Sequence, residues 1–86
     1  MTTPTHPKPK KLTAEALGHW LKGVRLHLCM NQVDFAAAVG VAQSHLSRME
    51  DGFLLPGYST TRRLIRGIAR VTNQDHLLIA KELLQL

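Results

Sequence analysis

The sequence has little of several residue types on which whole fold classes depend. It contains one cysteine, Cys29, so no internal disulfide can form, and its histidines lack the spacing that gathers metal ligands. Its apolar runs, such as residues 35–39, fall far short of the roughly 20 residues that cross a bilayer. Residues 1–11 contain no apolar segment of a secretory signal. These absences exclude a disulfide scaffold and a membrane span, and we expect a cytoplasmic protein that binds no metal.

The motifs of catalysis are also missing. There is no recognisable pair of catalytic carboxylates, no nucleophile elbow and no phosphate-binding loop. Cys29 stands beside Met30, where we expect it to be buried at a helix end rather than activated. The sequence therefore predicts a protein that is not an enzyme and that needs no cofactor.

The positive charge is the first feature that is present. Eleven Lys and Arg residues against six Asp and Glu give a formal net charge of +5 in 86 residues, a length that suits one domain. Such a charge indicates a polyanionic partner, although it also serves solubility alone. Residues 1–11 hold three of the lysines and three of the four prolines. They predict a flexible basic N-terminal arm, which either follows a DNA groove or acts as a solubilising tail.

Apolar residues from Leu12 onward recur at helical spacing, without the alternation typical of strands. They predict an all-α, compact five-helix domain over residues 12–86. The first helix begins after Thr13 and turns Leu17, Leu21, Val24 and Leu28 inward. The next two span residues 32–39, capped by Asn31 and ended by Gly40, and residues 43–50, followed by Gly52. The last two span residues 60–71, capped by Ser59 or Thr60, and residues 74–85.

The segments 32–39 and 43–50 read as a helix-turn-helix, with Ala36 at the helix crossing and Gly40 in the turn. At about 100° per residue, the outward face of the second helix carries Gln43, Ser44, Ser47 and Arg48, with Asp51 at its end. Arginine can read guanine and glutamine can read adenine, each through two hydrogen bonds in the major groove. The alternative is an ordinary polar helix surface.

The run MNQVDFAAAVGVAQSHLSRMEDG resembles the helix-turn-helix of the Cro/CI type, or XRE family, of phage, plasmid and bacterial repressors. The matching positions are Gln32, Ala36, Gly40, Ser47, Glu50 and Gly52. The resemblance implies a lambda-repressor-like DNA-binding fold. Ala42 departs from the family because it replaces the usual Ser or Thr cap, and the segment after Pro56 is longer than usual.

The resemblance also implies residue roles. Gln43, Ser44 and Arg48 would read bases, and Ser47 would contact a base or a phosphate. Asn31 and Gln32 would contact the DNA backbone, with His45 as a further candidate for a phosphate contact. Arg25 and Glu50 would form a structural salt bridge, and removal of either partner can cost on the order of 3–5 kcal/mol where burial is deep.

Two further surfaces leave alternatives open. In the fourth predicted helix, Arg62 and Arg63 either approach phosphate or belong to a solvated charged face, whereas Arg70 lies too far along the helix to reach DNA. The last helix carries more leucines than one stripe needs, including Leu77, Leu78, Leu83 and Leu84. They predict a homodimer interface, the alternative being that they complete the chain's own core.

The sequence thus predicts a transcription regulator, foremost a repressor that binds a palindromic operator as a homodimer. The alternative is an antitoxin that binds a toxin and also controls its own operon. Nonspecific binding to RNA or to an anionic membrane is a third possibility.

Overall fold

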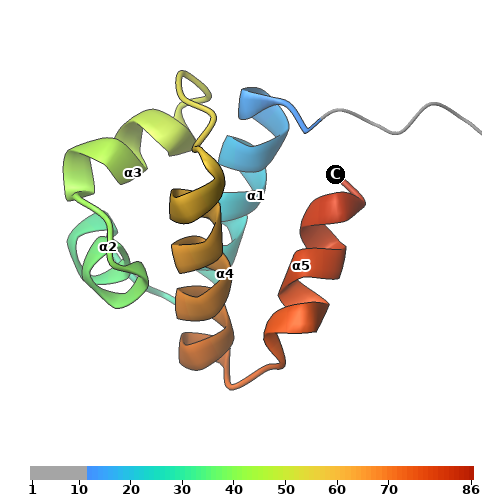
Figure 1. Ribbon diagram of the computed structural model, residues 1–86. Helices are drawn as coiled ribbons and strands as arrows, with labels where there is room; N and C mark the ends of the chain where they lie inside the picture. The colour runs from blue at the N-terminus through green and yellow to red at the C-terminus, as the bar shows by residue number, and fades with distance from the viewer. Residues whose placement is uncertain (1–11) are drawn as a thin grey trace, which may run out of the picture.

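The computed structural model describes residues 12–86, which form five α-helices and no strand (Figure 1). The helices are α1 (Ala14–His27), α2 (Gln32–Val39), α3 (Gln43–Glu50), α4 (Tyr58–Thr72) and α5 (His76–Leu84). The all-α, five-helix prediction is therefore confirmed for this part of the chain. The arm predicted over residues 1–11 lies outside the described residues.

Local signals set the bounds of the first two helices. The Thr13 hydroxyl accepts a hydrogen bond from the Ala16 N–H at 3.0 Å, and Asn31 Oδ1 accepts one from the Asp34 N–H at 2.8 Å. Gly40 ends α2 in the left-handed region, with a φ of 75°, where glycine pays no steric cost. As expected from Ala42, α3 has no side-chain cap. Both α2 and α3 cover the predicted residues.

The last two helices begin at other residues than predicted. Gly57 rather than Ser59 or Thr60 is the N-cap of α4, so both predicted caps lie inside the first turn. The Thr61 hydroxyl donates to the Gly57 carbonyl at 2.8 Å. Asp75 caps α5 by accepting the Leu77 N–H at 3.0 Å, which leaves the predicted start at residue 74 outside the helix.

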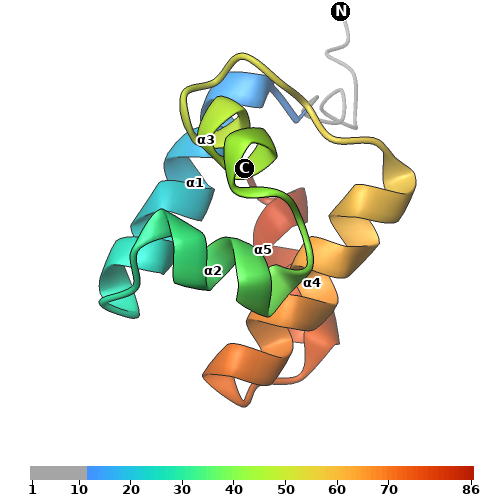
Figure 2. The same ribbon diagram turned by 90° about the vertical axis from the view of Figure 1, so that its left-hand side faces the viewer.

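The core lies where α1 packs on α3, α2 packs on α4, and α4 packs on α5. Leu17 and Leu21 of α1 are fully buried, whereas Val24 and Leu28 are half-buried at its edge. In Figure 1, α4 stands between the α2–α3 pair on one side and α5 on the other. The first three helices therefore expose a face well away from α5, and Figure 2 views this face directly.

The turn between α1 and α2 corrects one prediction. Cys29 is exposed, not buried, and has a φ of 58°. It lies in the turn just after Leu28, the C-cap of α1, in a left-handed conformation that is sterically costly for a residue with a Cβ.

Two features are absent from the described residues, a membrane-spanning helix and a cluster of metal-binding side chains. No helix within residues 12–86 is long and apolar enough to span a membrane. The same residues contain no group of three or more His, Cys, Asp and Glu side chains that could hold a metal ion.

Candidate nucleic-acid interface

One side of α3 is anchored in the core and the other is exposed. Leu46 and Met49 are fully buried, whereas Gln43, Ser44 and Arg48 are exposed. Ser47 is half-buried between them, and His45 is half-buried on the flank. Because buried residues hold the helix by one side, the polar side chains lie on a fixed surface. The structure thus brings together the four residues predicted to read bases.

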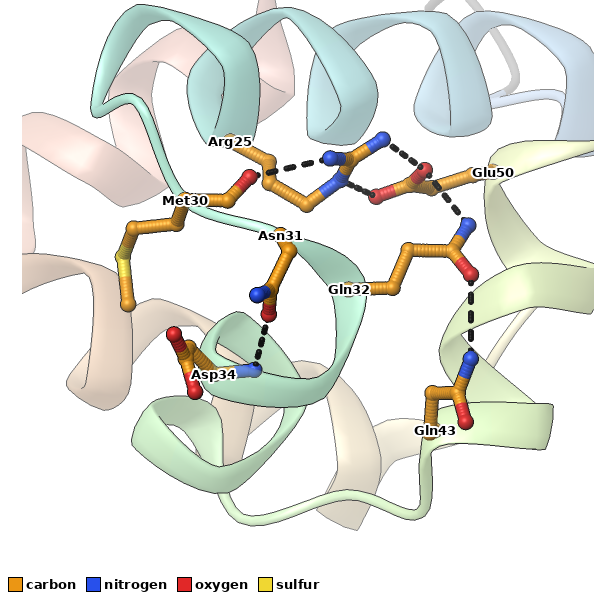
Figure 3. A network of polar contacts seen from close by, with 7 residues as sticks. All are labelled: Arg25, Met30, Asn31, Gln32, Asp34, Gln43 and Glu50. Atoms are coloured by element: carbon orange, nitrogen blue, oxygen red, sulfur yellow. Dashed lines mark hydrogen bonds and ion pairs between the residues drawn. The ribbon is translucent and has the colours of Figure 1, made fainter.

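A buried ion pair joins α1 to the end of α3 (Figure 3). Arg25 Nε donates to Glu50 Oε2 at 2.7 Å, and Arg25 Nη2 donates to Glu50 Oε1 at 3.0 Å. A third guanidinium nitrogen, Nη1, donates to the Met30 carbonyl at 3.0 Å. The side chains are only 10% and 1% exposed, and the hydrogen bond to Glu50 raises the pKa of Arg25 above its ordinary value. The salt bridge implied by the resemblance is therefore present.

The ion pair continues into a chain of two glutamines (Figure 3). Gln32 Nε2 donates to Glu50 Oε1 at 3.1 Å, and Gln32 Oε1 accepts from Gln43 Nε2 at a longer 3.4 Å. Gln32 was expected at the DNA backbone, but here its amide is engaged within the protein. One N–H and one lone pair of that amide are left for another partner. The network thus brings Gln43 into contact with Gln32, which the sequence did not reveal.

The other predicted backbone contacts lie at the N-cap of α2 and on α4. Asn31 caps α2 with its oxygen, and the described contacts leave its amide nitrogen at the surface. Arg62 and Arg63 are exposed on α4, where the Arg62 guanidinium carbon lies 5.7 Å from the centre of the Tyr58 ring. Cations are attracted to such ring faces, so this contact orients Arg62.

Arg70 has a role that the sequence analysis missed. Its Nη2 donates to the carbonyl of Ala38 at 2.8 Å, near the C-terminal end of α2. That end carries no basic residue of its own. A cation there is favourable because the last carbonyls of a helix carry partial negative charge. The spacing of the arginines indicated an exposed face, but the partner on another helix could not be read from it.

The leucines of α5 divide into two sets. Leu77, Leu78 and Leu84 are 63%, 53% and 81% exposed. Leu83, by contrast, is 6% exposed and packs with Ile79 in the core of its own chain. The inclusion of Leu83 in a dimer interface is therefore wrong, because its side chain is already covered.

Comparison of the chain with family models, with curated proteins and with solved structures gives no match. The functional argument therefore rests on the residues and their geometry.

Proposed function

We propose that this protein is a sequence-specific DNA-binding regulator in which α2 and α3 act as a helix-turn-helix and α3 enters the major groove. The observation that carries the proposal is the exposed polar side of α3. Gln43, Ser44 and Arg48 lie on it, with the exposed Asp51 beyond them at the C-cap, while the opposite side of the helix is buried in the core. The major groove of B-DNA admits a helix of this kind.

The side chains suit base edges for a chemical reason. A guanidinium such as that of Arg48 presents two parallel donors, which match O6 and N7 of guanine. A side-chain amide such as that of Gln43 offers a donor and an acceptor, which match N6 and N7 of adenine. Because Gln43 is already bonded to Gln32, its orientation is restricted before DNA arrives. This restriction reduces the conformational entropy that the side chain loses on binding.

The surrounding groups fit a role at phosphates. Asn31 and Gln32 lie at the start of α2, where the helix dipole favours anions, and each retains amide hydrogens. His45 on the flank of α3 and the cations Arg62 and Arg63 extend this set. Contacts to phosphate position a protein on the duplex without reading its sequence.

Repression through a palindromic operator completes the proposal. Two copies related by a two-fold axis would place their α3 helices in successive major grooves, roughly 34 Å apart. The apolar surface left on α5 for a second copy consists of Leu77, Leu78 and Leu84.

The experiment that tests the proposal is selection of bound duplexes from a random DNA pool, followed by titration with each variant. The replacement Arg48→Ala should cost roughly 1–3 kcal/mol on the selected operator and little on scrambled DNA. The matched control is Arg66→Ala, which removes the same charge from the exposed side of α4 and should leave the preference for the operator intact.

A second variant tests the contact between Gln32 and Gln43. Gln32→Ala should weaken binding to both duplexes because a phosphate contact is lost. It should also lower the preference for the operator, because Gln43 loses its hydrogen-bond partner. Equal losses on both duplexes for Arg48→Ala, or a pool without enrichment, would contradict the proposal.

A further inference from the structure

The groove between α4 and α5 is lined by both polar and apolar residues. Two adjoining hollows, each of about 260 Å³, lie along it and share Ile65 and Ala80 as lining residues. One hollow continues to Arg62, Arg66 and His76, and the other continues to Leu84 at the end of α5. We call this groove the α4/α5 trough. Figure 1 shows α5 on the side of α4 opposite to α2 and α3, so an occupant of the trough leaves α3 uncovered.

The shape of the trough favours a segment of protein over a small molecule. Each hollow is smaller than the roughly 300–1,000 Å³ of typical ligand pockets, but together they follow the two helices. On α5, Leu77, Ala80 and Leu84 are three and four residues apart, so they form one stripe along the rim. Apolar side chains spaced by one helical turn on a partner would fit such a stripe.

The charges around the trough specify the partner further. Arg62 and Arg66 are one turn apart on α4, both exposed, and residues 58–74 contain no acid. On α5, the imidazole of His76 also lines the trough. The carboxylate of the capping residue Asp75 lies 3.7 Å from His76 Nδ1. A phosphodiester backbone would satisfy the arginines but not the leucines. A helix that carries both carboxylates and apolar side chains would satisfy both.

We infer that the α4/α5 trough binds an acidic amphipathic helix of another protein, with carboxylates one turn apart paired to Arg62 and Arg66 and apolar side chains packed on Ile65 and Ala80. A second copy of this chain fits less well, because none of its six Asp and Glu residues are three or four positions apart, as a pair facing Arg62 and Arg66 from one helix would be. Leu78 lies about 160° round α5 from Ala80 and stays available to a second copy. The inference does not depend on the proposed DNA binding, but a bound helix would occupy Arg62, Leu77 and Leu84, so these residues would not at the same time contact phosphate or a second copy.

The test uses the full chain and a synthetic helical peptide of about 18 residues, long enough to hold a helix. The peptide carries leucines on one side and glutamates one turn apart beside them. Two control peptides replace either the glutamates by lysine or the leucines by alanine. We expect only the first peptide to bind, with amide chemical-shift changes at Arg62, Ile65, Arg66 and Ala80.

Two matched pairs of variants localise the binding. Arg66→Glu should lower the affinity for the peptide about tenfold or more. Lys22→Glu, the same charge change on the exposed side of α1, should lower that affinity less than about twofold. Leu77→Ser should weaken binding and Leu78→Ser should not, although both leucines are exposed. Circular dichroism checks that each variant stays folded.

Several results would overturn the inference. They are an absence of binding, equal binding of the alanine control peptide, chemical-shift changes confined to α3, or equal losses for Arg66→Glu and Lys22→Glu. A chain that is dimeric alone and becomes monomeric on Leu77→Ser would show that a second copy occupies the trough. Displacement of the peptide by scrambled duplex would assign the arginines to nucleic acid. The proposed function fails separately, through the DNA selection described above.

Discussion

Cys29 shows how a single residue can depart from its usual environment. Cysteine is among the residue types most often buried, so its place beside Met30 predicted a buried site. In the structure, position 29 instead lies in the turn between α1 and α2, with a φ of 58°. A residue with a Cβ is strained there, and the exposed thiol makes no contribution to the core.

The replacement Cys29→Gly should therefore stabilise the fold. Glycine removes the strain of roughly 1–2 kcal/mol but loses part of the gain to its greater freedom when unfolded, so we expect a net gain of about 0.5–1 kcal/mol. Urea unfolding followed by circular dichroism measures it. Cys29→Ala removes the same thiol but keeps the strain, so its stability should match that of the parent chain. If alanine stabilises as much as glycine, strain at this position is not the cause.

The polar network shows which residue contacts a sequence can indicate. The Arg25–Glu50 pair was expected from a resemblance, and the structure contains it. The Gln32–Gln43 bond was not expected, because it depends on how two helices approach each other. The available signal was that each glutamine is the first residue of its helix, Gln32 of α2 and Gln43 of α3. That signal places each glutamine at the N-terminal end of its helix, but it does not show that the two side chains meet.

At the scale of helices, local caps explain both the successes and the errors of prediction. Asn31 and Gly40 enclose α2 with unambiguous signals, so its bounds were predictable. At the start of α4 several residues can act as caps, and in isolation Ser59 is a better cap than Gly57, while Thr60 is about as good as Gly57. For α5, Asp75 is a favoured type of cap, but the helix was predicted to begin one residue earlier, directly after Asn73. Packing of α4 on α2 and α5 therefore decides what the local signals leave open.

Close approach of helices leads to a prediction on two glycines. A Cβ on Gly67 of α4 would lie 2.6 Å from Val39 Cα of α2, so Gly67→Ala must push the two helices apart. Overpacking of this kind typically costs 1–3 kcal/mol, and we expect a net loss of about 1–2 kcal/mol after the better helix propensity of alanine. The matched control is Gly23→Ala, where a Cβ meets nothing within 4 Å. It should stabilise α1 by about 0.5–1 kcal/mol.

Thermal or urea unfolding of both glycine variants measures the difference. Because the substitutions are chemically identical, helix propensity cancels in the comparison and the contact with α2 remains. Equal stability of the two variants would mean that α2 and α4 can separate without cost.

At the scale of the whole molecule, the periodicity of apolar residues was enough to predict an all-α chain of five helices. It was not enough to predict which leucines of α5 face inward. Leu83 and Leu84 are neighbours, yet one is buried and the other is 81% exposed. The rotation of α5 about its own axis is set by its contact with α4, where Ile79 and Leu83 enter the core. A leucine-rich helix without regular polar positions does not specify this rotation.

The distribution of charge along the chain gives a prediction for the intact protein. Residues 1–11 contain three of the eleven basic residues and no acid, so their deletion lowers the formal net charge from +5 to +2. Affinity for any duplex should fall at low salt, and the slope of log affinity against log salt should decrease by as much as about 3. The preference for the selected operator over scrambled DNA should stay the same. Titrations of both duplexes at several salt concentrations measure these quantities, and a reduced preference would show that the segment takes part in reading.

The tether between Gln32 and Gln43 has a consequence for how this chain can diverge. A mutation at position 43 leaves Gln32 Oε1 without its partner, and Gln32 is also bonded through Nε2 to the carboxylate of the buried Arg25–Glu50 pair. Ser44 and Arg48 have no such connection among the described hydrogen bonds, so their identity is independent of the core. New surface chemistry on α3 should therefore arise first at positions 44 and 48. Position 43 should change only together with position 32.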